Sequence, residues 1–175
     1  SASSTASQEL TDSSYFQDIT EASGVRFMHR SSNWLSRQLR TYLEKDETTG
    51  ITTIPPAFGG GGAAAGDIDN DGDQDLLLVS GLGNALFINQ GTGTFIEQAS
   101  VRGLGWVRAD GMPGEPRQPL IADLDNDGHQ DIVVTFVDDR HRVYKNRGDG
   151  SFDDVTNTAS LGGEGLVGGP ATVFD

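Results

Sequence analysis

The chain has 175 residues, a length typical of one domain, and a formal net charge of -14, so it lacks the basic face that nucleic-acid binding requires. It contains no cysteine, which excludes disulfides, thiolate metal sites and cysteine nucleophiles. Its apolar runs are too short for a transmembrane helix, and its first residues do not resemble a signal peptide.

The N-terminal part divides into a tail and an interrupted repeat region. Residues 1–12 are rich in serine and threonine and lack periodicity, which predicts a disordered tail or a strand lent to a neighbour. Residues 13–175 form one repeat-containing segment. Within it, residues 31–47 carry apolar side chains at helical spacing, which predicts a short amphipathic helix inserted before the first repeat.

Two acidic stretches of the chain are almost identical. The first acidic loop, residues 67–75, reads DIDNDGDQD, and the second acidic loop, residues 123–131, reads DLDNDGHQD. Each has aspartates at positions 1, 3, 5 and 9 and a glycine at position 6. So many carboxylates in a short loop repel one another unless a cation lies between them.

The spacing of these acids predicts two calcium sites. Calcium takes six to eight oxygen ligands at flexible geometry. We expect position 7 to contribute its backbone carbonyl, because Asp73 of the first loop is replaced by His129 in the second. Gly72 and Gly128 permit the sharp reversal. The expected ligands are Asp67, Asp69, Asp71, Asp73 and Asp75 in the first loop, and Asp123, Asp125, Asp127, His129 and Asp131 in the second.

Three other interpretations of the loops fit the sequence less well. An EF-hand shares the opening of the motif but needs a bidentate acid at position 12, which is Leu78 in one copy and Val134 in the other. Both residues are expected to point into a core. A magnesium site is disfavoured because magnesium retains several waters. A solvated acidic turn without metal does not explain two copies in matched contexts.

The segments after the loops repeat as well. Residues 87–95 (FINQGTGTF) recur as residues 144–152 (YKNRGDGSF), and paired glycines in each copy predict a turn. Short apolar runs rich in β-branched residues predict strands. The predicted strands are residues 76–79, residues 85–89 and a strand from Phe95 in the first unit, and residues 132–137, residues 142–146 and a strand from Phe152 in the second.

The length of the unit favours propeller blades. A repeat of roughly 57 residues with several short strands fits one blade better than a helical pair, so the predicted fold is all-β. Residues 170–175 resemble residues 119–123, which indicates that Asp175 is the first aspartate of a third loop. Two full units cannot close a ring of typically four to eight blades. We therefore expect a fragment of a longer polypeptide, or a sheet set completed by other chains.

The motifs resemble a known family. The acidic loops, the preceding FGGGGAAAGD of residues 58–67 and the NxGxGxF turns are similar to FG-GAP/VCBS repeats, the calcium-bearing blades of integrin-α-type β-propellers. The opening YFQDITEASGVRFMH of residues 15–29 resembles bacterial proteins related to cartilage acidic protein. The resemblance covers roughly residues 15–175. It implies a β-propeller and calcium but no single activity, since such repeats occur in adhesins, in accessory subunits and beside some enzyme domains.

These features predict a non-catalytic, calcium-stabilised module for protein–protein or adhesion-type binding, or for scaffolding. It is expected outside the cytoplasm (secreted, at the cell surface or in the periplasm), because extracellular-type sites bind calcium at roughly 10⁻⁴–10⁻³ M. The expected partners are other protein chains or the rest of a longer propeller. Two alternatives are a scaffold part of a polysaccharide-active or other hydrolytic enzyme, and an accessory subunit tethered to a membrane-associated assembly.

No catalytic residue is predicted. His29, His129 and His141 show no Ser/His/Asp spacing, and the chain has no nucleophile elbow. Residues 147–149 read Arg-Gly-Asp, an integrin-recognition tripeptide. The corresponding turn of the first unit, residues 90–92, reads Gln-Gly-Thr, so we interpret the tripeptide as a coincidence.

Overall fold

The computed structural model describes residues 16–29, 61–105, 114–136, 139–159 and 172. These residues form two four-stranded antiparallel sheets, so the described part of the chain is of the all-β class, as its sequence predicts. Two short helices, α1 (Thr20–Ser23) and α3 (Thr156–Ala159), flank the sheets. Neither described helix is long and apolar enough to span a bilayer.

The first sheet is a meander in the order β1-β2-β3-β4. Antiparallel pairing sets Leu76 opposite Phe87, and Asn89 opposite Phe95 at the turn before the last strand. The strands are β1 (Gly62–Gly66), β2 (Asp75–Ser80), β3 (Gly83–Asn89) and β4 (Phe95–Glu97).

The second sheet repeats this order as β5-β6-β7-β8. Ile132 lies opposite Tyr144, and Asn146 lies opposite Phe152, at the same places as in the first sheet. The predicted strands are therefore confirmed, except that residue 137 lies outside the described residues. The strands are β5 (Pro116–Ala122), β6 (Asp131–Phe136), β7 (Arg142–Asn146) and β8 (Phe152–Asp154).

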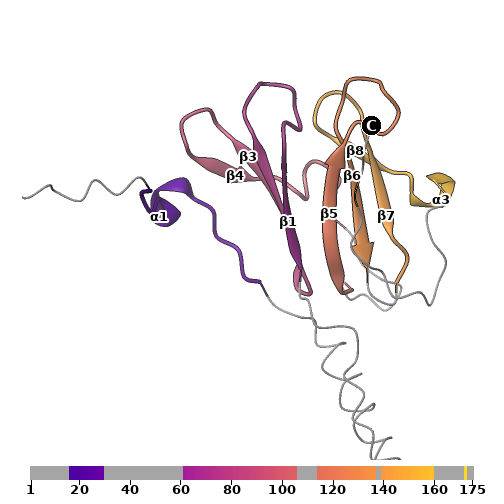
Figure 1. The fold of residues 1–175 in the computed structure, drawn as a ribbon, viewed down its shortest axis with the longest axis horizontal. Coiled ribbons are helices and arrows are strands. Elements are labelled where there is room, and N and C mark those ends of the chain that lie inside the picture. Colours follow the sequence, from indigo (N-terminus) through magenta and orange to yellow (C-terminus); the bar gives the residue numbers. More distant parts are fainter. Residues whose placement is uncertain (1–15, 30–60, 106–113, 137–138, 160–171, 173–175) are drawn as a thin grey trace, which may run out of the picture.

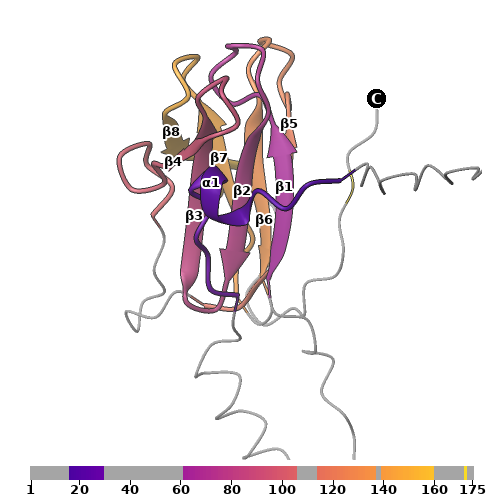
Figure 2. The same ribbon diagram turned by 90° about the vertical axis from the view of Figure 1, so that its left-hand side faces the viewer.

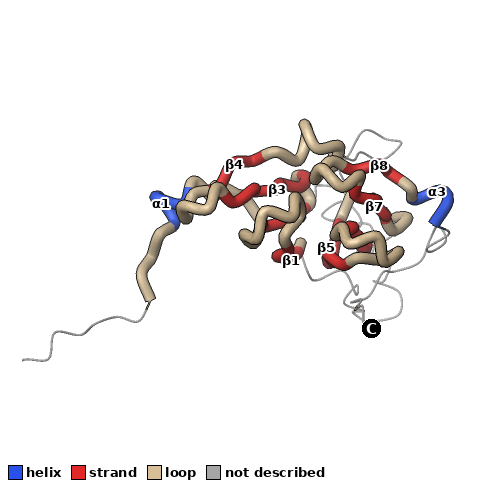
Figure 3. Tube along the Cα trace, turned by 90° about the horizontal axis from the view of Figure 1, so that it is seen from above, coloured by secondary structure: helices blue, strands red, loops and turns tan. Residues whose placement is uncertain are grey.

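The sheets meet along their first strands. β1 packs against β5, and Figures 1 and 3 show these two strands side by side where the sheets face each other. Small residues make the approach possible: a Cβ on Gly62 would lie 2.7 Å from the Arg117 carbonyl oxygen, and one on Gly66 would lie 2.5 Å from Ile121 Cγ2. The glycines of β1 therefore set the spacing between the sheets.

The core lies between the two sheets. Leu77 and Val79 of β2 face Ile132, Val134 and Phe136 of β6 across it, and all five have no exposed surface. Residues on alternate positions of a strand point to opposite faces of the sheet. Each sheet therefore contributes one apolar face to this core.

The two position-12 residues differ in burial. Val134 lies in the core, as expected. The expectation for Leu78 was wrong: it is only half-buried, because it alternates with Leu77 and Val79 and so lies on the outer face of the first sheet. Both residues are still apolar, and neither supplies the acid that an EF-hand requires.

The N-terminal segment 16–29 crosses the outer face of the first sheet. Figure 2 shows α1 in front of β2 and β3, and the Ser80 hydroxyl donates a hydrogen bond of 3.4 Å to the Met28 carbonyl. The predicted tail (residues 1–12), the predicted helix (residues 31–47) and Asp175 lie outside the described residues.

Candidate metal centre

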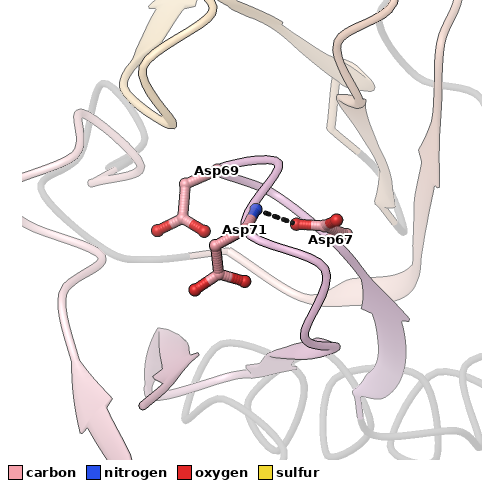
Figure 4. A group of neighbouring side chains, drawn as sticks. All are labelled: Asp67, Asp69 and Asp71. Carbon is pink, nitrogen blue, oxygen red and sulfur yellow. Dashed lines mark hydrogen bonds between the residues drawn. The ribbon is translucent and has the colours of Figure 1, made fainter. Parts of the chain in front are cut away.

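The first acidic loop joins β1 to β2 and gathers three carboxylates. One oxygen of each of Asp67, Asp69 and Asp71 lies within 4.8 Å of the others. Figure 4 shows the three side chains leaving the loop, with the Asp71 amide bonded to Asp67. A group made only of carboxylate oxygens is the donor set that hard cations prefer.

Hydrogen bonds between side chains and backbone hold this loop in shape. Asp67 accepts from the backbone amides of Asp71 (3.1 Å) and Gly72 (3.0 Å), and Asp71 accepts from the amide of Asp73 (2.9 Å). Asn70 and Gly72 adopt positive φ angles of 58° and 93°, which asparagine and glycine tolerate best. The acids and the glycine of the motif therefore shape the loop as well as lining it.

Asp75, at position 9, is the first residue of β2 and is fully buried. Its two oxygens accept hydrogen bonds from the backbone amides of Ile68 (2.9 Å) and Asn89 (2.8 Å), so it ties the loop to β3. Burial raises the pKa of the Asp75 carboxyl, and the charges of Asp69 and Asp71 raise it further, against the opposing effect of the two amides. A cation beside these acids would favour the ionised form.

Asp69 carries an unsatisfied oxygen. Its Oδ2 accepts a hydrogen bond of 2.9 Å from Arg102, whose guanidinium also bonds Gln98 through Nε. Its Oδ1 is buried and has no hydrogen-bond partner. A buried carboxylate oxygen without a partner costs free energy, so the first loop offers a ligand atom that a cation would satisfy.

The second acidic loop joins β5 to β6 and repeats the arrangement. The carboxylates of Asp123, Asp125 and Asp127 gather in the same way. Asp123 accepts from the amides of Asp127 (3.1 Å) and Gly128 (2.9 Å), and Asn126 adopts a φ of 61°. At position 9, the buried Asp131 accepts from the amides of residues 124 (3.2 Å) and 146 (2.9 Å).

A lysine distinguishes the second loop. The ammonium of Lys145, in β7, donates to Oδ2 of Asp125 and lies 3.1 Å from Oδ2 of Asp127. The corresponding residue of the first sheet is Ile88, which is buried in the core. The acids of the second loop thus have a cationic partner that is built into the chain.

The position-7 side chains lie beside the turns that follow β3 and β7. A Cβ on Gly91 would lie 2.9 Å from Asp73 Oδ2, which places that carboxylate beside the turn after β3. His129 lies beside the matching turn, and its Nδ1 is 2.7 Å from the side-chain Nδ2 of Asn70 in the first loop. The prediction that position 7 contributes its backbone carbonyl agrees with these directions and stays a prediction.

The other sequence candidates have structural partners. His141 Nδ1 accepts a hydrogen bond of 3.2 Å from the Phe136 amide. In the Arg-Gly-Asp tripeptide, the Arg147 guanidinium bonds both oxygens of Asp153, and Asp149 accepts from the Ser151 amide (2.9 Å). Both charged groups of the tripeptide are therefore engaged with neighbours on the same hairpin.

Three further residues contact the acidic loops, and the sequence motifs do not predict these contacts. Lys145, Arg102 and Asn146 contact the acidic loops from elsewhere in the chain, and Asn146 donates to carbonyl groups of both loops. Two sequence signals accompany them: Ile88 is replaced by Lys145 between the copies, and Asn146 is the first residue of an NxGxGxF turn. A change from an apolar to a cationic residue at one repeat position indicates a local charge partner.

Comparisons with known proteins agree with this geometry. The FG-GAP-like repeat family matches residues 67–134 and residues 123–175, and each match begins at the first aspartate of an acidic loop. The chain is also similar to cartilage acidic protein 1 of Xenopus tropicalis, with 37% identity over 87 residues. That match covers 49% of this chain and 13% of the relative, so the matched segment spans a small part of that protein.

Proposed function

Because the chain belongs to the FG-GAP-like repeat family, we propose that it is a non-catalytic, calcium-stabilised binding or scaffold module built from propeller-type blades. Each four-stranded sheet is one blade of the proposed array. The equivalent placement of the acidic loops, each between the first and second strand of its sheet, supports this assignment.

The partnerless buried oxygen of Asp69 carries the proposal for a cation. The carboxylates of Asp67, Asp69 and Asp71 would hold calcium together with the carbonyl of Asp73. Asp75 would join them, since a carboxylate offers about four lone-pair sites and the two backbone amides occupy only two. Calcium would cancel the repulsion between these acids and tie the loop to β2.

The second loop supports the same assignment through the same residue types. Its side-chain donors would be Asp123, Asp125, Asp127 and Asp131, with the carbonyl of His129 at position 7. The hydrogen bonds of the two loops match at positions 1, 5 and 9, so both loops hold their acids in the same arrangement.

The proposed partners are further blades, from a longer chain or from another protein. Ile132 and Val134 are buried because the first sheet covers that face of the second. Their repeat counterparts, Leu76 and Leu78, are half-buried on the outer face of the first sheet. Among the described residues, segment 16–29 crosses that face (Figure 2). A further blade packed on the outer face of the first sheet would bury Leu76 and Leu78, as the first sheet buries Ile132 and Val134 of the second.

We place the proposed module outside the cytoplasm. Extracellular calcium modules work at roughly 10⁻⁴–10⁻³ M, a concentration that extracytoplasmic spaces supply. The acidic charge of the chain agrees with a role in binding proteins rather than nucleic acid.

Thermal unfolding in EGTA and in calcium tests the proposal. A ligand that binds only the folded state adds about 2.7 kcal/mol per site at a concentration 100 times its Kd. The melting temperature should therefore rise with calcium and fall in EGTA, and magnesium at the same concentration should do less. The double change Asp69→Asn with Asp71→Asn should remove part of the calcium response. An identical transition in calcium and in EGTA would refute the metal assignment.

A further inference from the structure

The two acidic loops share their acids but differ in the cation that contacts them. In the second loop, the Lys145 ammonium bonds Asp125 and lies 3.1 Å from Asp127, so it bridges two of the three gathered carboxylates. In the first loop, Arg102 contacts Oδ2 of Asp69 and leaves Oδ1 without a partner. The second loop is therefore neutralised more fully by the chain itself.

The side chains of Arg102 and Lys145 also differ in how firmly they are held. The Arg102 side chain is 15% exposed and is held by Gln98 as well as by Asp69, so it stays beside the first loop. The Lys145 side chain is 42% exposed, and an ammonium on a four-carbon stem turns readily toward water. Lys145 is thus held loosely enough to leave its carboxylates.

We infer that Lys145 is a built-in counter-cation of the second acidic loop, which calcium must displace, so that the second loop binds calcium more weakly than the first. This inference rests on the proposed calcium sites. The ammonium and calcium cannot share the same carboxylate oxygens, because like charges at that separation repel. Without metal, Lys145 holds Asp125 and Asp127 together, whereas the first loop depends on calcium for that role.

Charge and repeat position support a specific role for this lysine. Lys145, in β7, is paired with Asp153 of β8. Its side chain also contacts two acids of the second loop, Asp125 and Asp127. In the first sheet, Ile88 lies opposite Ile96, and the position carries no charge. The replacement of Ile88 by Lys145 therefore adds a cation to the second loop, beyond the differences at Arg102 and at position 7.

Calcium titration by calorimetry at constant pH tests the inference. The second loop is isolated by Asp69→Asn with Asp71→Asn, and its Kd is compared with and without Lys145→Met, which keeps the aliphatic stem. Removing the ammonium should lower the Kd of the second loop by about threefold to tenfold, the size expected of one or two half-exposed ion pairs. In the chain with both loops intact, Lys145→Met should bring the two affinities closer together.

Two variants serve as controls. Arg26→Met removes one positive charge that pairs with Glu21 in the N-terminal segment, and it should leave the Kd of the second loop unchanged. Lys145→Gln removes the same charge as Lys145→Met with a polar side chain, and it should reproduce the tighter binding. Agreement between the two substitutions at Lys145 would separate the charge from packing effects.

The melting temperature of Lys145→Met, measured in EGTA and in calcium, separates a counter-cation role of Lys145 from a purely structural one. In EGTA, Lys145→Met should lower the melting temperature, because Asp125 and Asp127 lose their counter-cation. In saturating calcium the difference should vanish. A deficit of equal size in both conditions, or an unchanged Kd for the second loop, would overturn the inference while leaving the calcium sites in place. Failure of either loop to bind calcium in every variant would overturn the proposed function as well.

Discussion

The side-chain amide of Asn146, in β7, donates a hydrogen bond of 2.9 Å to the backbone carbonyl of Ile68, in the acidic loop of the other sheet. The same amide donates to the Gln130 carbonyl (3.0 Å), and its oxygen accepts from the amides of Gly148 and Gly150. A single buried side chain therefore links both acidic loops to the turn before β8.

Asn146→Ala should destabilise the protein by about 2–4 kcal/mol, because it leaves several buried backbone groups unpaired at once. Asn146 is 1% exposed, so water cannot replace the lost bonds without repacking. Urea unfolding in saturating calcium measures the change. The matched control is Asn89→Ala, whose side chain is half-buried and bonds only its own sheet; it should cost about 1 kcal/mol. Equal losses would show that the contact with Ile68 contributes little.

Gly66→Ala should destabilise the contact between the sheets. A Cβ at this position would meet Ile121 Cγ2 at 2.5 Å and would also press on the Gln130 side chain. Overpacking of this kind costs about 1–3 kcal/mol. Gly105→Ala is the control, because a Cβ there meets no atom within 4 Å, and it should change stability by less than about 0.5 kcal/mol. If chemical unfolding gave the same midpoint for both variants, the close approach of β1 and β5 would not limit side-chain size.

The strands differ in how clearly the sequence encodes them. β2 and β6 follow their loops as runs of Leu, Ile and Val, which favour strands through packing on a pleated surface. β1 consists of the residues Gly-Ala-Ala-Ala-Gly, which have low β propensity and no alternating pattern. Its strand conformation depends on pairing with β2 and on close packing against β5, which are contacts that no local pattern reveals.

The residues of the candidate site also differ in how far the sequence predicts their positions. The spacing of Asp67, Asp69 and Asp71 within one short loop suffices to predict that their carboxylates gather. The positions of Lys145 and Arg102 do not follow from spacing, because each reaches its loop from a distant part of the chain. Tertiary packing alone decides which acids they contact, and that choice distinguishes the two loops.

Asp73 and Asp71 should respond differently to substitution by histidine. Asp73→His should leave the calcium affinity of the first loop within about threefold, because position 7 is His129 in the second loop and the Asp73 carboxylate lies beside the turn after β3. Asp71→His should weaken binding by about tenfold or more, since it removes a gathered carboxylate and ligand charge sets affinity. Calorimetric calcium titration of both variants measures the difference. A large loss with Asp73→His would assign its side chain, rather than its carbonyl, as the ligand.

The pair formed by Arg147 and Asp153 should appear in an acid titration. Hydrogen bonding from the Arg147 guanidinium holds the pKa of the Asp153 carboxyl below its usual value of 3.8. Carboxyl-detected NMR should therefore give a midpoint for Asp153 below that value, and Arg147→Met should move it upward. The same bonds occupy the arginine of the Arg-Gly-Asp tripeptide, so a low midpoint would also argue against its display to a receptor.

The lowered pKa of Asp153 determines how the stability of the fold changes with pH. A carboxyl whose pKa is lower in the folded state stabilises the fold above its unfolded value, and the contribution disappears as the pH falls through the folded value. The stability difference between the native chain and Arg147→Met should therefore be present at neutral pH and shrink below about pH 4. Ser151→Ala provides the comparison. It removes the hydroxyl whose hydrogen bond, followed by that of the Ser151 amide, lowers the pKa of Asp149, so the Asp153 midpoint should not move. A difference between the native chain and Arg147→Met that persisted unchanged into strong acid would mean that the guanidinium acts through packing rather than through its charge.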